Sequence, residues 1–329
     1  MIAARHRISW LMAAALLSLV LTVQPFRDSD VWWHLAMGHY IIAHGIPTAE
    51  PFSFLHAANP WVGQQWLYEV GLARLVDLGG AGLASLVMGA VASSALLVAV
   101  LSIPRERRPS GPWLAGALLL SALVAGQFVG VRGQVISLLG AAVVLNVVTR
   151  WRGGSARALL ALPPLFLIWA NLHAGFIIGL GIALVALLTV RTTDWRLRRL
   201  LGAAIVAAAL ATLVNPSGTG LWAYVVTTFT NSTLTGVVTE WQSPDFHDAW
   251  LRLFEAEAIL LVTSWTLSSR RQPVDLVLAG ATFAAALQAQ RNIPLFAVIA
   301  APQLAVYGAA AWSAHGARLS GRRGPAWWP

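Results

Sequence analysis

Long apolar runs, separated by short charged segments, repeat along almost the whole chain. A helix that crosses a bilayer needs about 20 predominantly apolar residues, and ten runs approach this length. They lie near residues 8–24, 80–103, 111–128, 132–149, 158–172, 175–191, 199–214, 252–268, 275–290 and 293–312. The pattern therefore predicts an all-α fold, a polytopic transmembrane helix bundle of about ten spans.

Three segments refine this layout. The apolar stretch 158–191 is too long for one span and contains the polar sequence 171–175, so we expect a helical hairpin to turn there. Residues 61–78 are amphipathic, which is typical of a short helix at the membrane interface. The first run has no small-x-small cleavage site before Gln24, so we expect an uncleaved first helix rather than a signal peptide.

The composition agrees with a membrane protein. Hydrophobic residues make up 57% of the 329 residues and charged residues 11%, against about 25% charged in soluble domains. We expect one transmembrane domain over residues 1–312, followed by a cytoplasmic basic tail over 313–329. The chain has no cysteine, which excludes disulfides, thiolate metal sites and cysteine nucleophiles.

The distribution of arginine predicts the orientation. All 22 basic residues are arginines and the net charge is +9, but they cluster between apolar runs, so we expect no nucleic-acid partner. One set of loops holds 17 of the 22, and the positive-inside rule places these loops and both termini in the cytoplasm. Loops near 25–79 and 215–251 would then face outward from the bacterial inner membrane. The arginines on that face are Arg27, Arg74, Arg132, Arg252 and Arg291.

Carboxylates and imidazoles gather on the predicted outer face. Acidic side chains do not follow the topology rule as arginines do, so their accumulation there indicates chemistry on the exoplasmic side. The acids are Asp28, Asp30, Glu50, Glu69, Glu240, Asp245 and Asp248, with Asp77, Glu255 and Glu257 near the interface; the histidines are His34, His39, His44, His56, His173 and His247.

Asp28 and Asp30 directly follow the first predicted span. A carboxylate there could deprotonate an acceptor hydroxyl as a general base, and two could hold a divalent cation, Mg²⁺ or Mn²⁺. The structural alternative is that these acids cap a helix that begins near Val31. Asp30 and His34, four residues apart on that helix, could be two ligands of the same cation, or ordinary neighbours on a helix face.

Arg132 and Arg291 lie at the outer ends of two different spans, each among apolar residues. A guanidinium at the membrane edge is costly unless it is paired or functional, and its planar fork suits a phosphate. The alternatives are a snorkelling side chain or a structural ion pair with Glu69 or Glu240.

Three other polar positions are candidates for substrate contacts. Trp241 lies beside Glu240 in a polar loop, where its ring could stack on a sugar, although outer tryptophans are also typical of an aromatic belt. Asn171 and His173 lie at the predicted hairpin turn, where they could donate to a bound oxygen or cap helix ends.

Taken together, these pieces resemble the GT-C class of polytopic membrane glycosyltransferases, over roughly residues 24–304. The resemblance rests on the motifs DSDVWWH at 28–34, PTAEPFS at 47–53, WLYE at 66–69, RGQ at 132–134, WANLHAG at 169–175, NPSG at 215–218, EWQSP at 240–244 and RNIP at 291–294, together with Trp61.

The resemblance implies a polyprenyl-phosphate sugar donor, with inversion at the anomeric carbon. It implies that Asp28 or Asp30 is the base or a metal ligand, that Glu50 and Glu69 are secondary acids, and that Arg132 and Arg291 face the lipid phosphate. The expected partners are the lipid-linked donor and membrane lipids. GT-C enzymes are usually longer, so the alternative is a non-catalytic scaffold that serves as a structural subunit of a larger membrane complex.

Overall fold

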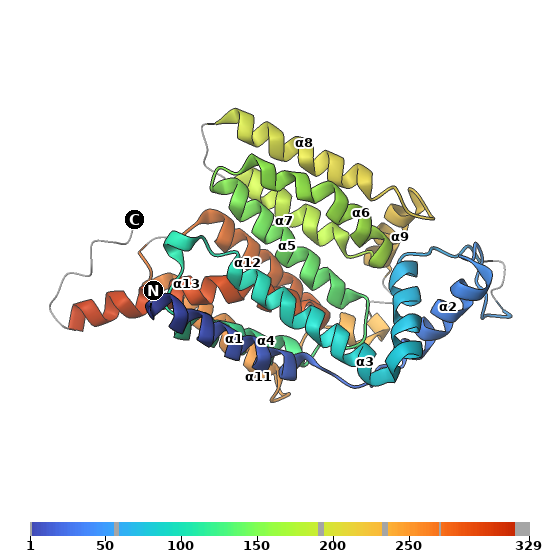
Figure 1. Ribbon diagram of the computed structural model, residues 1–329, viewed down its shortest axis with the longest axis horizontal. Helices are drawn as coiled ribbons and strands as arrows, with labels where there is room; N and C mark the ends of the chain where they lie inside the picture. The colour runs from blue at the N-terminus through green and yellow to red at the C-terminus, as the bar shows by residue number, and fades with distance from the viewer. Residues whose placement is uncertain (1, 56–58, 190–193, 232–235, 270, 320–329) are drawn as a thin grey trace.

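The computed structural model describes residues 2–55, 59–189, 194–231, 236–269 and 271–319, and these are almost entirely helical (Figure 1). Within these ranges there are twelve α-helices and one isolated bridge, between Ala49 and Pro60. The helices are α1 (Ile2–Thr22), α2 (Asp30–His44), α3 (Trp66–Leu101), α4 (Gly111–Gly126), α5 (Gln134–Arg152), α6 (Leu162–Leu172), α7 (Phe176–Thr189), α8 (Trp195–Ala211), α9 (Gly220–Thr230), α11 (Leu251–Leu267), α12 (Pro273–Gln288) and α13 (Ile293–Leu319).

A helix stands in each of the ten predicted apolar runs, which confirms the all-α membrane fold. By length and composition, three described helices could cross a membrane alone: Trp66–Leu101, Gln134–Arg152 and Gln290–His315. Five shorter helices are also apolar. His56, Arg191, Arg270 and the last ten residues of the predicted tail lie outside the described residues.

Helix α3 has a kink that divides it into two parts. Gly79 and Gly80 leave the helical conformation, and Gly80 has φ +68°, in the left-handed region that glycine adopts without a steric penalty. The part before the kink, residues 66–78, corresponds to the amphipathic helix predicted over 61–78. The part after it corresponds to the predicted span at 80–103.

The predicted hairpin turn is also present. Helix α6 ends at Leu172, His173 takes an extended conformation, and α7 begins at Phe176. The two glycines Gly140 and Gly179 lie against the Trp169 ring, so that an added Cβ would come within 2.7 Å of it. These close contacts hold α5, α6 and α7 together directly below the turn.

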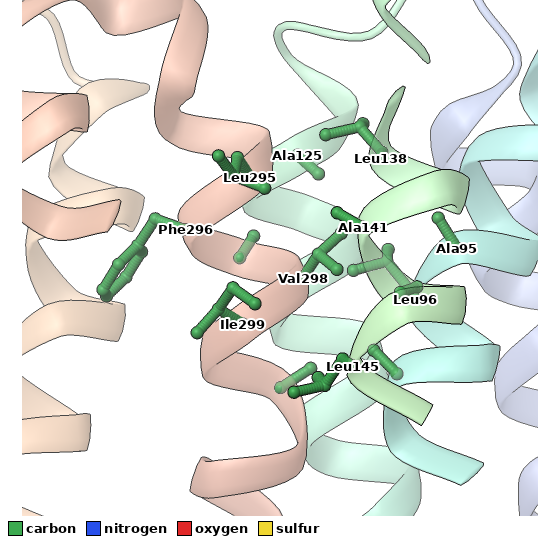
Figure 2. Close-up of a cluster of buried hydrophobic side chains, with 14 of the residues drawn as sticks. Ala95, Leu96, Ala125, Leu138, Ala141, Leu145, Leu295, Phe296, Val298 and Ile299 are labelled. Carbon is green, nitrogen blue, oxygen red and sulfur yellow. The ribbon is translucent and has the colours of Figure 1, made fainter. Parts of the chain in front are cut away.

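The core is built around α13, which packs against α3, α4, α5, α11 and α12. Figure 2 shows Leu295, Val298 and Ile299 of α13 facing Leu138, Ala141 and Leu145 of α5, with Ala95 and Leu96 of α3 behind them. The hydrophobic window of this helix is 89% buried within the protein. A helix that is apolar all round and enclosed by other helices is a central element rather than a lipid-facing one.

The two ends of the bundle differ in what they carry. Helices α2 and α9 and the first part of α3 lie at one end, and the N-terminus and the end of α13 lie at the other (Figure 1). The first turns of α5, α7 and α13 belong to the end that carries α2. This end also contains most of the candidate site residues.

One glycine allows α2 to pack directly on α3. A Cβ at Gly38 would lie 2.1 Å from the backbone oxygen of Glu69, so we expect Gly38→Ala to lower the free energy of unfolding by about 1–3 kcal/mol through overpacking. Thermal unfolding in detergent measures this. The control is Gly71→Ala on α3, where nothing lies within 4 Å of the new Cβ and helix propensity favours alanine. Equal stability of the two variants would contradict the proposed close contact.

Candidate functional site

A cavity of about 410 Å³ opens at the α2 end of the bundle. Its lining comes from α2, the start of α3, α5, the α6–α7 turn, α9, the short helices η3 (Thr239–Trp241) and η4 (Gln290–Asn292), and the start of α13. The polar lining includes seven predicted site residues: Asp30, His34, Arg132, His173, Glu240, Trp241 and Arg291. The apolar lining includes Leu138, Ile177, Ile178, Val225 and Leu295. Chain segments more than 200 residues apart therefore form one pocket with a charged and an apolar wall.

A second cavity, of about 340 Å³, adjoins the first. Both are lined by Arg132, Gln134, Glu240 and Arg291, and the smaller one also reaches Asp28. These four shared residues therefore form a polar partition between the two cavities.

The partition is a chain of alternating charges. Arg132 Nε donates to Asp28 Oδ2, and Arg132 Nη1 donates to Glu240 Oε2. The other carboxylate oxygen of Glu240, Oε1, lies 3.1 Å from Arg291 Nη1. Two arginines and two carboxylates thus neutralise one another. Arg132 and Arg291 therefore form the ion pairs with Glu240 that were expected from the sequence as the alternative to phosphate binding.

Arg291 is held from two further directions. Its guanidinium carbon lies 4.2 Å from the centroid of the Trp241 ring, a cation–π contact. Its Nη2 donates to Gln134 Oε1 at 3.1 Å. One face of Trp241 is therefore covered by Arg291, and the ring also makes an edge contact with Phe229 of α9, with the ring centroids 6.1 Å apart.

The two aspartates at the start of α2 have different surroundings. Asp28 is 17% exposed; its Oδ2 pairs with Arg132 and its Oδ1 accepts the backbone N–H of Asp30 at 3.1 Å. The N-cap position is Ser29, whose side chain makes no capping bond. Asp30 is exposed and lines the larger cavity, and within the described part of the chain its carboxylate has neither an ion pair nor a hydrogen bond. Asp30 is therefore the aspartate with a carboxylate available for chemistry.

His34 is turned toward α3. Its Nδ1 lies 3.1 Å from Glu69 Oε1, and Gln65 Nε2 lies 3.0 Å from the same nitrogen. Glu69 is 1% exposed, and its Oε2 has no hydrogen-bond partner among the described residues. These contacts connect α2 to α3 beneath the cavity.

His173 faces the same cavity from the α6–α7 turn. Its Nδ1 accepts the backbone N–H of Gly175 at 3.0 Å and lies 2.8 Å from Ser137 Oγ, which itself accepts from Trp169 Nε1 at 2.9 Å. Because Nδ1 is an acceptor, the neutral ring carries its proton on Nε2. Burial lowers the pKa of His173 to about 3, with a further contribution from the positive charge of Arg291. The ring is therefore a neutral donor at physiological pH rather than a base.

This depressed pKa predicts the pH dependence of stability. The pKa of the folded chain, about 3, lies below the ordinary value of 6.5, so the unfolded chain binds more protons between these limits. The contribution of neutral His173 to the free energy of unfolding is complete above about pH 6.5. It is lost as the pH falls toward 3, by at most about 1.4 kcal/mol per pH unit. Unfolding in detergent at a series of pH values should show a weaker acid dependence for His173→Gln than for the wild type. Identical dependence in both proteins would contradict the assignment.

Three predicted site residues line neither cavity. The Oε1 atom of Glu50 accepts the backbone N–H of Phe52 at 3.0 Å, and Glu69 lies below the cavity against His34. Asn171 accepts from Trp66 Nε1 and donates to the carbonyls of Leu167 and Val214, each at 2.8 Å. Asn171 therefore connects α3, α6 and the segment after α8.

The cavity also includes polar residues that the sequence did not single out as site residues. Gln65, Gln134, Ser137 and Tyr224 line it. Gln134 belongs to the RGQ motif at 132–134 and Gln65 to the Gln64-Gln65 pair, so a local signal existed for these two. Ser137 and Tyr224 lie inside helices with no distinguishing pattern.

The lining does not provide a complete set of metal ligands. Among the residues that the structure describes, no group of three or more histidine, cysteine or acidic side chains converges to hold a metal ion. His34, the predicted partner of Asp30, is engaged by Glu69 and Gln65. A metal site at Asp30 and His34 stays a prediction.

The architecture is similar to that of a known membrane enzyme. A crystal structure of the Archaeoglobus fulgidus oligosaccharyltransferase in the apo form matches with a TM-score of 0.57 and 18% sequence identity, over 92% of this chain and 50% of that chain. The chain thus spans about half the length of that protein. No protein-family model matches the sequence, and no curated protein does either. At 18% identity this likeness concerns the fold alone, which is that of a helical, multi-pass membrane protein.

Proposed function

We propose that this protein is a membrane glycosyltransferase that moves a sugar from a polyprenyl-phosphate donor to an acceptor on the exoplasmic face. The observation that supports this most strongly is the composition of the larger cavity. It combines the carboxylate of Asp30, which has no partner among the described residues, with two guanidinium groups and an apolar wall. An amphiphilic donor with a phosphate, a sugar and a hydrocarbon chain needs these three surfaces.

The lining residues suggest a role for each part of the donor. The phosphate would accept from the N–H groups of Arg132 and Arg291 that remain outside their ion pairs, and from Nε2 of His173. The sugar would stack on the Trp241 ring, on the side away from Arg291. The first isoprene units would pack against Ile177, Ile178 and other apolar lining residues.

The proposed reaction is a single displacement at the anomeric carbon. Asp30 accepts the proton of the acceptor hydroxyl while the hydroxyl oxygen forms a bond to the anomeric carbon. The bond between that carbon and the phosphate oxygen breaks, and polyprenyl phosphate leaves with the bonding electrons. The arginines stabilise the charge that develops on the leaving phosphate. Inversion of configuration follows from a single displacement.

The test is turnover by purified protein in detergent or in liposomes. Polyprenyl-phosphate sugars with different head groups are incubated with the protein and a crude acceptor fraction from a bacterial membrane. Mass spectrometry should detect free polyprenyl phosphate and a glycosylated product whose anomeric configuration is inverted. Absence of both products with every donor would contradict the proposal.

The orientation is part of this proposal, and the absence of cysteine makes it simple to measure. Ser243 and Ser155 are exposed, near the site and at the opposite end of the bundle respectively. In intact cells with a permeabilised outer membrane, a membrane-impermeant maleimide should label Ser243→Cys, but should label Ser155→Cys only after lysis. The reverse pattern would place the site on the cytoplasmic face.

One observation favours a second function, a structural subunit of a larger membrane complex. Asp28, Arg132, Glu240 and Arg291 are already matched in charge without a ligand, as expected if their purpose is to hold the first loop on the bundle. Purification in mild detergent would then yield a second membrane protein in fixed stoichiometry, and no turnover with any donor.

A further inference from the structure

A cavity of about 830 Å³, roughly twice the volume of the candidate site, lies at the opposite end of the bundle. It is lined by the ends of α3 and α5, the short helix η1 (Arg105–Arg107), the start of α12 and the middle of α13. Gln134 and Arg152 line the two sites from either end of α5. At a rise of 1.5 Å per residue they are about 27 Å apart along the helix, so this cavity is separate from the candidate site.

Arginine dominates the polar lining of this cavity. Five guanidinium groups come from the segment after α3 and from the last turn of α5, and the carboxylates among the described lining residues are Glu106 and Asp275. Asp275 Oδ2 accepts a hydrogen bond of 2.6 Å from the hydroxyl of Tyr307, and the charge of Asp275 also acts on Arg152. The arginines are Arg105, Arg107, Arg108, Arg150 and Arg152.

None of these five arginines forms an ion pair with another residue in the described part of the chain. Arg108 Nη2 donates to the carbonyls of Leu101 and Ile103, and its buried Nε has no partner there. Arg152 donates to Gln272 Oε1 at 2.8 Å, and Arg107 lies 5.8 Å from the Tyr307 ring centroid. Burial lowers the pKa of Arg108, as do the neighbouring positive charges of Arg7 and Arg105. Within the described residues, two carboxylates face five guanidinium groups, so the repulsion is compensated only in part.

The membrane-topology rule explains why arginines occur in these loops, but not why they converge. Arg196 and Arg199 follow the same rule, yet they are exposed on α8 and line no part of this cavity. The contrast with the candidate site is also informative. There each arginine forms an ion pair with a carboxylate, whereas here, among the described residues, the five arginines outnumber the two carboxylates.

An anion would complete this site. Guanidinium groups bind phosphate oxygens through paired, charge-assisted hydrogen bonds. The N-terminus of α12, a helix of 16 residues, adds the positive end of its dipole to the same cavity. Leu145, Ile299 and Val306 line the cavity as apolar surface. Basic pockets between membrane helices bind the head groups of anionic lipids in this way.

We propose that this cavity is a second binding site, which takes a phosphate group on an anionic phospholipid or on a small soluble molecule. The ligand supplies negative charge to the arginines of the segment after α3 and of the last turn of α5, and it holds these two segments together. The site is independent of the proposed transferase reaction, because it shares no lining residue with either cavity at the α2 end.

The test measures binding of two probes to the full-length protein in detergent: phosphatidylglycerol by native mass spectrometry, and inorganic pyrophosphate by thermal shift. We expect Arg105→Gln with Arg150→Gln to weaken binding by about tenfold or more, as expected for lost charge-assisted hydrogen bonds. Both side chains are exposed, and neither makes a hydrogen bond to another described residue. The matched control is Arg196→Gln with Arg199→Gln, which removes the same charge outside the cavity and should leave binding unchanged.

A third variant separates a cavity from a merely basic surface. Thr149→Phe keeps every arginine but places a ring in the lining, so it should weaken binding as well. If the double arginine variant fails to fold, Thr149→Phe still tests whether the ligand binds in this cavity. Binding of only the lipid or only pyrophosphate supports the proposal and identifies the source of the phosphate. The proposal is overturned if the wild type binds neither probe, if both double variants lose affinity equally, or if Thr149→Phe binds like the wild type.

Discussion

Asp30→Asn is expected to reduce sugar transfer by about 10²–10⁴-fold, the contribution of a general base, with little change in stability. Asp30 lines the larger cavity, is exposed, and lacks an ion pair within the described residues, so the amide costs the fold nothing while removing the proton acceptor. Asp28→Asn should act differently, because Asp28 holds Arg132. For that variant we expect a loss of about tenfold, seen mainly as a higher KM for the donor.

The measurement is the steady-state rate with a polyprenyl-phosphate sugar, together with an unfolding curve for each variant. Asp77→Asn is the matched control: it makes the same chemical change on the exposed surface of α3, where Asp77 contacts His39 outside the cavity, and it should transfer at the wild-type rate. If Asp30→Asn retains wild-type activity, Asp30 is not the base.

Arg132→Gln is expected to lower both stability and donor binding, the largest combined effect of any single substitution in the site. Arg132 is the central link between Asp28 of the first loop and Glu240 of the second. Its removal leaves two partly buried carboxylates to repel one another. Breaking a fully buried pair costs about 3–5 kcal/mol, and exposure of 17–31% in these side chains reduces this to about 1–3 kcal/mol.

A double-mutant cycle with Glu240→Gln isolates the pair, since the second substitution should be less costly once Arg132 is gone. Arg132→Lys should rescue little, because a single ammonium cannot replace the two-pronged contact to both acids. Arg74→Gln, an exposed arginine of α3, is the control and should change stability by less than about 0.5 kcal/mol. Strict additivity in the cycle would contradict the ion-pair chain.

The helices could be predicted because membrane spans have a strong and local signal. Apolar runs of near-membrane length, broken by glycine and polar turns, placed a helix at each of ten positions, and the break at 171–175 was found from one polar stretch. Helix α9 was not predicted, because it is only 11 residues long and falls in the segment 215–251 that the arginine pattern assigned to an outer loop. Its apolar residues, which include Leu221 and Val225, form a run too short for a membrane span.

The site could be predicted in its members but not in its pairings. Charge on the predicted outer face selected Asp30, Arg132, Glu240 and Arg291, and the structure brings them to one cavity. The sequence left open whether Arg132 would contact Glu69 or Glu240, because 108 residues separate Arg132 from its actual partner. The difference between Asp28 and Asp30 was equally inaccessible. Asp28 and Asp30 belong to one motif but face different cavities, and only Asp28 is paired with an arginine among the described residues.

The neutral state of His173 shows the same limit. Its position at a hairpin turn could be read from the sequence, but its pKa depends on burial and on Arg291, which lies in another part of the chain. The resemblance to GT-C glycosyltransferases agrees with the fold. The donor, the acceptor and the role of each residue are our proposals.

The most direct test of the central claim is a structure of the protein with a non-hydrolysable polyprenyl-phosphonate sugar. We predict that the phosphonate lies against Arg132, Arg291 and His173, that the sugar lies over Trp241, and that the carboxylate of Asp30 faces the anomeric carbon. A ligand bound outside the cavity that these residues line, or a cavity that stays empty at saturating ligand, would contradict the account.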